Sequence, residues 1–216
     1  MAGLCFNRGM MTPDSPQVEC PVARSRLHID DRGWLHPVRH CPSPNYNARP
    51  DPDDISLLVV HNISLPPGRF GGDTIERFFC NRLTRGEDPF LDTILDLTVS
   101  AHMLIRRDGE PVQFVGFQDR AWHAGRSWYR GREECNDFGI GIELEGTDEH
   151  PYTEAQYRQL AAVTACLVNH YPFMEFQRVT GHSDIAPGRK TDPGPSFNWS
   201  WFRRCLNDMS APEGRE

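Results

Sequence analysis

A Pro- and Gly-rich stretch near the C-terminus places three chemically capable side chains close together in the chain. His182, Lys190 and Asp192 lie between Gly181 and Gly194. Prolines and glycines shape this backbone, so we expect a loop that holds the three side chains in fixed relative positions before a ligand arrives. An imidazole and a carboxylate can bind a metal ion, and an ammonium group can stabilise negative charge. The stretch therefore indicates a preformed site for metal or charge chemistry.

A further metal-binding side chain lies far away in the sequence. His61 follows the apolar run LLVV at 57–60, so it is expected at the tip of a buried strand. Two histidines and one carboxylate are a common ligand set for catalytic zinc, whose fourth position stays open for water. His61, His182 and Asp192 thus favour hydrolysis. Their spacing is not a compact zinc motif, and taken alone it leaves an ordinary structural role open.

The segment GIGIELE at 139–145 alternates with the period of a strand. Ile140 and its apolar neighbours are expected on the core face, whereas Gly141 and Glu143 face the other way. Glycines beside a glutamate would leave a bare floor on which a ligand could lie, and Glu143 is a candidate general base. The alternative is a half-exposed strand with solvated acids.

Most of the nine histidines are expected to be unremarkable. His102 on a predicted strand favours a hydrogen-bonded structural role. His123, within the string AWHAG, suits a groove wall and could contact a substrate without touching the metal. The remaining histidines outside the candidate ligand set are expected at the surface, in loops or at a helix end. They are His28, His36, His40, His150 and His170.

The composition limits the class of protein. With 216 residues, the chain is long enough for one domain with a full core. Its net charge of -7 argues against nucleic acid or anionic lipid as a partner, because binding phosphates usually needs a basic face. Seven scattered cysteines without a C-x-x-C pair favour free thiols and a reducing compartment. No secretory signal or membrane span is found, so we expect a cytoplasmic protein.

Strand and helix patterns alternate along the chain. They predict strands at 57–60, 101–106, 111–117 and 139–145, and helices at 73–80, 153–171 and 199–206. This order predicts the α/β (α+β) class, with a central mixed β-sheet flanked by helices in a single domain. We expect that domain at 25–210, after a disordered extension at 1–24 and before a tail at 211–216.

The chain resembles the zinc amidases of peptidoglycan, the N-acetylmuramoyl-L-alanine amidase family related to phage T7 lysozyme and the peptidoglycan recognition proteins. The resemblance spans nearly all of 34–202, and is nearest to cytoplasmic members that act on 1,6-anhydro-muropeptides. It is carried by LLVVHNISLPPGRFGG at 57–72, SAHMLIRRDG at 100–109, RAWHAG at 120–125, NDFGIGIELEGTD at 136–148, YTEAQYRQLAAVT at 152–164, and 180–195.

The resemblance implies roles for the residues already singled out. His61, His182 and Asp192 would bind Zn2+, Glu143 would be the catalytic acid/base, and Lys190 would help to stabilise the oxyanion. The bond cut would be the amide between (1,6-anhydro-)N-acetylmuramic acid and L-alanine, in cell-wall recycling that indirectly regulates β-lactamase. We expect a monomer whose partners are anhydro-muramyl peptides. The candidate substrate contacts are Asn62, Trp122, His123 and Ala186.

Two positions depart from the pattern expected of near relatives, which carry arginine there. This chain has Thr98 and Glu134 instead. If those arginines bind a carboxylate of the stem peptide, their replacement removes two charge-assisted contacts. The preferred stem peptide is therefore open. Four other arginines could compensate or could simply be solvated, namely Arg106, Arg107, Arg126 and Arg132.

Two rival functions remain open. Some members of this fold bind peptidoglycan fragments without cutting them, but they lack part of the zinc set that is present here. A secreted amidase acting on intact wall is disfavoured by the cysteines and by the absence of a secretory signal.

Overall fold

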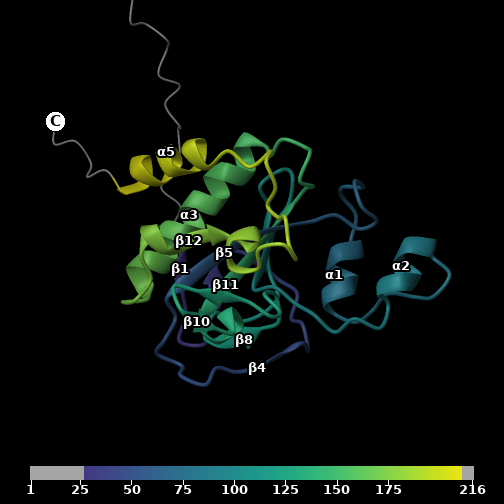
Figure 1. The fold of residues 1–216 in the computed structure, drawn as a ribbon, viewed down its shortest axis with the longest axis horizontal. Helices are drawn as coiled ribbons and strands as arrows, with labels where there is room; N and C mark the ends of the chain where they lie inside the picture. The colour runs from purple at the N-terminus through teal and green to yellow at the C-terminus, as the bar shows by residue number, and fades with distance from the viewer. Residues whose placement is uncertain (1–26, 211–216) are drawn as a thin grey trace, which may run out of the picture.

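The computed structural model describes residues 27–210, which form a mixed sheet with helices packed against it (Figure 1). The extension expected at 1–24 and the tail at 211–216 lie outside the described residues. The strands are β1 (His28–Ile29), β2 (Leu35–His36), β3 (Arg39–His40), β4 (Tyr46–Ala48), β5 (Leu57–Ile63), β6 (Met103–Ile105), β7 (Pro111–Gln113), β8 (Asp119–Ala121), β9 (Trp128–Tyr129), β10 (Arg132–Glu133), β11 (Gly139–Glu145) and β12 (Val179–Gly181). The helices are α1 (Thr74–Phe79), α2 (Pro89–Ile94), α3 (Glu154–His170), α4 (His182–Ile185) and α5 (Trp199–Ser210), with 3-10 turns η1 (Cys135–Asp137) and η2 (Phe176–Arg178).

The central sheet has six strands in the order β12-β5-β11-β6-β7-β3. β5 pairs in parallel with both β12 and β11, and β11 pairs in parallel with β6. The hairpin predicted around Asp108 and Gly109 is the antiparallel β6–β7 pair. In the β5–β11 register, His61 lies opposite Glu143. This pairing brings His61 and Glu143, which are more than 80 residues apart in the sequence, next to each other.

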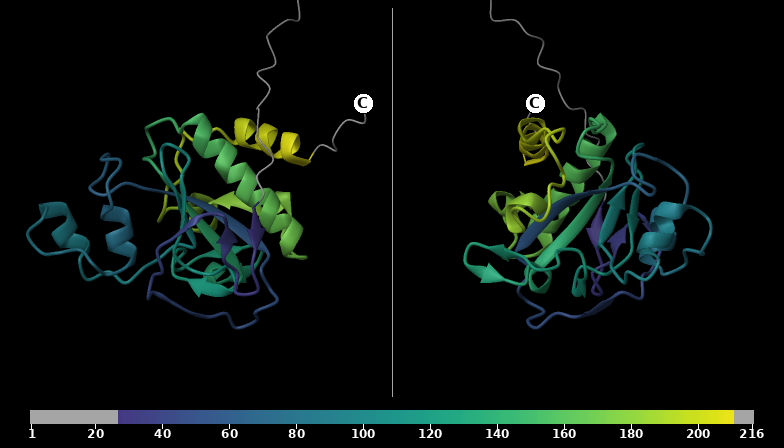
Figure 2. Two further views of the ribbon diagram at one scale, coloured as in Figure 1. Left: turned by 180° about the vertical axis from the view of Figure 1, so that it is seen from behind. Right: turned by 45° about the vertical axis from the view of Figure 1, so that its right-hand side comes forward.

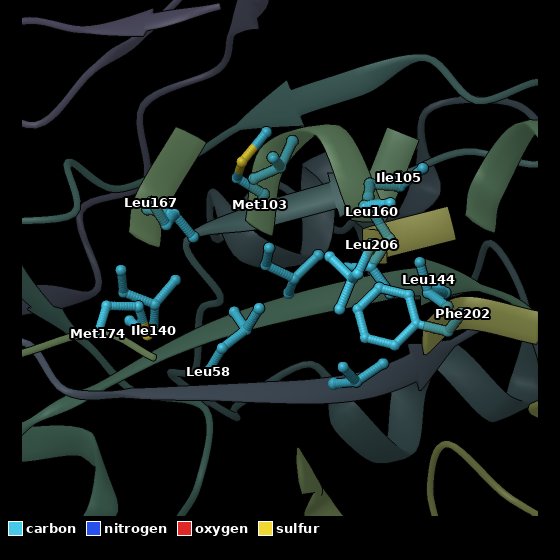
Figure 3. Packing of buried hydrophobic residues seen from close by; sticks show 14 of the residues in the cluster. Leu58, Met103, Ile105, Ile140, Leu144, Leu160, Leu167, Met174, Phe202 and Leu206 are labelled. Atoms are coloured by element: carbon cyan, nitrogen blue, oxygen red, sulfur yellow. The ribbon is translucent and has the colours of Figure 1, made fainter. Parts of the chain in front are cut away.

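The main core lies between the sheet and the helices α3 and α5 (Figure 3). Leu58, Ile140 and Leu144 of the sheet belong to one cluster with Leu160 and Phe202 of the helices, and all five are buried. The capping box predicted at the start of α3 is present, because Thr153 and Gln156 exchange side-chain and backbone hydrogen bonds. The alternating strand and the helical stripe were thus sufficient to predict this layer.

A second cluster of buried side chains lies under α1 and α2, which stand together at one side of the molecule, apart from α3 and α5 (Figure 2). Phe79 of α1 and Leu91 of α2 pack with Leu104 of β6 and with Phe114, which directly follows β7. No helix in the described part of the chain is long and apolar enough to cross a membrane.

The elements differ from the predicted ones mainly at their ends. β6 and β7 are three residues each, shorter than the predicted 101–106 and 111–117. β5 continues two residues beyond His61, so this histidine is not at the tip of the strand. α2 was not predicted; Pro89 starts it, and the side chain of Asp88 caps it by accepting a hydrogen bond from the backbone N–H of Phe90.

The expectation of a bare glycine floor on β11 is wrong. Every residue of this strand is buried. The ring of His123 covers Gly141 so closely that a Cβ atom built there would lie 2.4 Å from the Cγ atom of His123. Sequence alternation gives the face to which a residue points, but not which distant side chain covers that face.

Gly141→Ala is expected to destabilise the protein by about 1–3 kcal/mol, because an added methyl group overlaps the His123 ring. Urea denaturation of the variant measures this cost. In a His123→Ala background the space is open, so the same change should cost much less. An equal cost in both backgrounds would show that His123 is not what requires glycine at position 141.

Candidate metal centre and cleft

Three side chains converge on one point. The Nδ1 atoms of His61 and His182 are 2.9 Å apart. The Oδ2 atom of Asp192 lies 3.1 Å from the first and 3.0 Å from the second. His61 and His182 are 1% and 3% exposed, so the two rings are almost closed to solvent, whereas Asp192 is half-buried. Among the described residues it is the group of histidine, cysteine and acidic side chains whose geometry could hold a metal ion.

Two neighbouring parallel strands position the histidines. His61 lies on β5, and β12 beside it leads directly into α4, whose first residue is His182. The stretch expected as a loop is therefore a short helix followed by turns. Asp184 caps this helix by accepting hydrogen bonds from Thr180 Oγ1 at 2.7 Å and the Gly181 backbone N–H at 2.9 Å.

Asp192 is brought back to the histidines by the main chain. The backbone N–H of Ser183 donates to the carbonyl of Asp192 at 2.9 Å, which ties the returning strand of the loop to α4. Residue spacing alone did not predict a compact site from His182 and Asp192. The turns between α4 and Asp192 make it compact.

The hydrogen bonds of the two rings turn their lone pairs toward each other. His182 Nε2 lies 3.1 Å from the carbonyl oxygen of Ala124, which can only accept, so this nitrogen carries the hydrogen. His61 Nε2 lies 3.0 Å from His123 Nδ1 and can donate to it. Each of these two candidate ligands thus has its outer nitrogen held by a neighbour, as is common for metal-binding histidines.

The consequence is an electron-rich centre. With the ring hydrogens on the outer nitrogens, two imidazole lone pairs and a carboxylate oxygen meet at about 3 Å, an arrangement that repels itself unless a cation lies among them. Burial lowers the pKa of His61 to about 4, so its ring is neutral at pH 7 and has a lone pair to offer. The donor set fits a metal with nitrogen and oxygen ligands, such as zinc.

The carboxylate of Asp192 is ionised. Burial alone would raise its pKa. When no cation is present and the Nδ1 atoms of His182 and His61 carry hydrogens, the hydrogen bonds they donate outweigh burial and leave the pKa below its usual value. One negative charge facing two imidazole rings suits a divalent cation.

Glu143 lies next to this centre on β11, opposite His61 in the strand register. Burial, together with the charge of Asp192, raises the pKa of Glu143 well above its usual value, and Lys190 opposes that rise. Its Oε2 atom is buried and has no hydrogen-bond partner among the described residues. A desolvated carboxyl group without a partner, beside a cation site, is suited to proton transfer.

A cleft of about 640 Å³ opens over the centre. Its walls include His61 and seven of the other eight predicted site residues. These seven are Asn62, Trp122, His123, Glu143, His182, Lys190 and Asp192. Ala186 is the exception, since it is buried and lines a separate cavity with Arg126 and Trp128. Phe78 and Phe79 of α1 form part of the same cleft wall.

The side chains of Asn62 and Trp122 are anchored within the protein. The Asn62 amide donates to Asp148 Oδ1 at 2.8 Å and to the carbonyl of Pro193 at 3.2 Å, which leaves its amide oxygen for a ligand. Trp122 Nε1 donates to Asn47 Oδ1 at 2.7 Å. Each residue can therefore present one fixed surface to the cleft.

Thr98 and Glu134 both lie at the surface and outside the cleft walls. Glu134 lies 3.6 Å from Arg120 in an ion pair. Three of the arginines considered as substitutes have partners in the protein: Arg106 pairs with Glu76, Arg107 donates to the carbonyl of Pro151, and Arg132 pairs with Asp54. Positive charge on the cleft wall comes from Arg189 and Lys190.

Two residues that support the site were not predicted. Asn136 Oδ1 accepts hydrogen bonds from the backbone N–H groups of His123 and Ala124. These bonds position the two residues that contact His61 and His182. Arg49 is buried and donates to the carbonyls of Phe117 and Gly139. Neither residue has a local sequence pattern that distinguishes it from a surface polar residue.

The structural role predicted for His102 is confirmed. Its Nδ1 atom accepts from the backbone N–H of Gly141 at 3.0 Å, and its Nε2 atom lies 3.1 Å from the carbonyl of Asp119. Of the histidines expected at the surface, His28, His150 and His170 are exposed, whereas His36 and His40 are half-buried.

Comparison with known proteins agrees with this geometry. Residues 51–195 match the family model described as N-acetylmuramoyl-L-alanine amidase. The 1,6-anhydro-N-acetylmuramyl-L-alanine amidase AmpD of Citrobacter freundii is 58% identical over 183 residues, which are 85% of this chain and 97% of that protein. A crystal structure of a selenomethionine AmpD derivative superposes with a TM-score of 0.79 at 58% identity, covering 82% of this chain and 98% of that one.

A more distant neighbour is a substrate complex. The amidase AmiD from Escherichia coli, bound to anhydro-N-acetylmuramic acid-L-Ala-D-γ-Glu-L-Lys, superposes with a TM-score of 0.52 at 28% identity. The match covers 83% of this chain and 65% of that structure. The sheet, the cleft and the extent of these matches lead to one assignment: this chain belongs to the N-acetylmuramoyl-L-alanine amidase family.

Proposed function

We propose that this protein uses zinc to hydrolyse the amide bond between 1,6-anhydro-N-acetylmuramic acid and L-alanine in muropeptides. The observation that carries the proposal is the meeting of His61, His182 and Asp192 beside Glu143 at the floor of an open cleft. The similarity to AmpD, together with the anhydro-muramyl peptide in the AmiD complex, supports the substrate class.

In this proposal His61, His182 and Asp192 hold the zinc ion. When bound, zinc supplies Lewis acidity that activates a water molecule and polarises the amide carbonyl. Glu143 accepts the proton of the attacking water and passes it to the nitrogen of the leaving L-alanine. Lys190 balances the negative charge that develops on the carbonyl oxygen. The products are a free peptide and an anhydro-sugar.

The cleft walls orient the substrate around this centre. The free amide oxygen of Asn62 is suited to an N–H of the peptide, and the Trp122 ring offers an apolar face to the sugar. His123 holds His61 through its Nδ1 atom and acts on the metal ligand in addition to lining the cleft. Ala186 is not part of this proposal, since it faces another cavity.

The domain extent, the oligomeric state and the compartment follow from the same proposal. The amidase domain covers 25–210 and acts as a monomer in the cytoplasm, where its substrates are soluble fragments of peptidoglycan. Cleaving those fragments recycles the wall and removes muropeptides that could induce a β-lactamase. The cysteine thiols support a reducing compartment, since Cys41 and Cys166 are among those in the described residues that form no disulfide.

Product analysis by mass spectrometry tests the activity directly. Zinc-loaded protein is expected to release tripeptide from anhydro-muramyl-tripeptide, and a chelator should abolish the release. The non-anhydro counterpart, assayed in parallel, measures how strictly the anhydro ring is required. If zinc-loaded protein cleaves neither substrate, the enzyme proposal is wrong, and a module that only binds muropeptides is the function to consider.

Asp192→Asn is expected to weaken zinc binding by more than about 100-fold, because it removes the charged ligand from the centre. Competition with a chromophoric chelator gives the zinc affinity, and turnover should fall with it. Asp108→Asn is the matched control, since Asp108 is exposed and lies outside the cleft. Unchanged zinc affinity in Asp192→Asn would remove Asp192 from the ligand set.

Glu143→Gln is expected to lower kcat by about 10²–10⁴-fold while zinc stays bound, because a general acid/base contributes on that scale. Glu145→Gln is the matched control. Glu145 lies on the same face of β11, but accepts hydrogen bonds from the backbone of Gly71 and Arg107 and is outside the cleft wall. Similar losses of kcat in both variants, at full zinc loading, would contradict a proton-transfer role specific to Glu143.

A further inference from the structure

Two thiols far apart in the sequence are in contact outside the cleft. Cys41 Sγ lies 3.6 Å from Cys80 Sγ, and 39 positions separate the two residues. Cys41 follows the edge strand β3, and Cys80 is the C-terminal cap of α1. The amidase chemistry proposed above uses neither residue.

The main chain around both cysteines is already fixed. The backbone N–H of Cys41 donates to the carbonyl of Gln113 on β7 at 2.8 Å. Ser43 Oγ donates to the carbonyl of Phe79, next to Cys80, at 2.5 Å. Asn45 Nδ2 donates to Asn81 Oδ1, on the other side of Cys80, at 2.8 Å. These contacts hold the two segments side by side, so the thiols meet without a search through the chain.

The remaining gap is small. A disulfide has an S–S length of about 2.05 Å, so the sulfur atoms must approach by about 1.5 Å from their present 3.6 Å. Rotation of the side chains about their Cα–Cβ bonds moves a sulfur atom over distances of that order. The backbone contacts described above can therefore remain.

The two thiols differ in a way that assigns an order of reaction. Cys41 is half-buried, and Arg82 Nη2 lies 3.3 Å from its sulfur, where a positive charge favours the thiolate. Arg82 also interacts with Cys80, so the order of reaction follows from the greater exposure of Cys41. Burial raises the pKa of Cys41, and the charge of Arg82 opposes that rise. Cys80 is buried, and its thiol faces the carbonyls of Pro42 and Cys41. Cys41 is thus accessible to an oxidant and Cys80 is placed behind it.

We propose that Cys41 and Cys80 form a redox modification site that closes to a disulfide when the protein meets a peroxide. The Cys41 thiol first gives its proton to solvent, and the thiolate attacks one peroxide oxygen and breaks the O–O bond. The leaving hydroxide takes up a proton from solvent, so the products are a sulfenic acid and one water molecule. The Cys80 thiol then attacks the sulfenic sulfur and releases a second water molecule. The sum is two thiols and one hydrogen peroxide giving one disulfide and two water molecules.

Closing this bond constrains one wall of the cleft. The cross-linked loop contains β5 with His61 and all of α1. Phe78 and Phe79 line the cleft and directly precede Cys80. α1 lies away from α3 and α5 in both figures, so the disulfide would add a covalent tie to a helix outside the main core (Figures 1 and 2).

Peroxide treatment of the full-length protein tests the proposal. After the remaining thiols are blocked, digestion and mass spectrometry should show a peptide pair joined through Cys41 and Cys80, which dithiothreitol separates. The oxidised protein should melt about 4–12 °C above the reduced protein. These readouts do not depend on amidase activity, so the test stands even if the proposed function fails.

Three single variants complete the test. Cys41→Ser and Cys80→Ser should each lose the joined peptide and the rise in melting temperature. In Cys80→Ser, dimedone should trap the sulfenic acid on Cys41. Cys166→Ser is the control and should behave as the parent, because the thiol of Cys166 donates to the carbonyl of Leu27. Peroxide that oxidises Cys41 to a sulfinic acid, or Cys166 as fast as Cys41, without joining Cys80 would overturn the proposal.

Discussion

The structure depends on keeping three electron-rich atoms about 3 Å apart in a buried place. The Nδ1 atoms of His61 and His182 and the Oδ2 atom of Asp192 would move apart if their backbones allowed it. They stay together because β5 and β12 are adjacent parallel strands and because the loop after α4 is hydrogen-bonded back onto that helix. The sheet therefore supplies the rigidity that a cation site needs before the cation arrives.

Neutral polar groups orient the two histidine rings by contacting their outer nitrogens. The carbonyl of Ala124 holds His182, the ring of His123 holds His61, and Asn136 fixes the backbone of both Ala124 and His123. One short segment thus controls the orientation of two candidate ligands on different elements. Gly141 belongs to the same arrangement, because a side chain at that position would displace the His123 ring.

The sequence predicted the elements whose pattern is local, and it missed the contacts that depend on pairing. The alternation of 139–145 and the apolar stripe of 153–171 correspond to β11 and α3, since each period follows from the geometry of one element. Two contacts were missed because they join residues far apart in the sequence. The ring of His123 covers Gly141, and the buried side chain of Arg49 donates to the carbonyl of Gly139. Periodicity carries no information about such pairs. The resemblance to a family, in contrast, predicted the cleft residues as one set.

Peptide recognition in this chain has to be built from what the cleft wall offers. Thr98 and Glu134 lie outside that wall, and Arg106, Arg107 and Arg132 are engaged with carboxylates or carbonyls of the protein. Arg189 donates to the carbonyls of Ala124 and Arg126, and so supports the segment that orients His182. Because moving Arg189 toward a ligand would release these carbonyls, Lys190 is the cleft cation that can approach a substrate at little structural cost. Lys190 also opposes the pKa rise of Glu143, so a carboxylate bound by Lys190 would act on the proposed proton-transfer residue as well as on affinity.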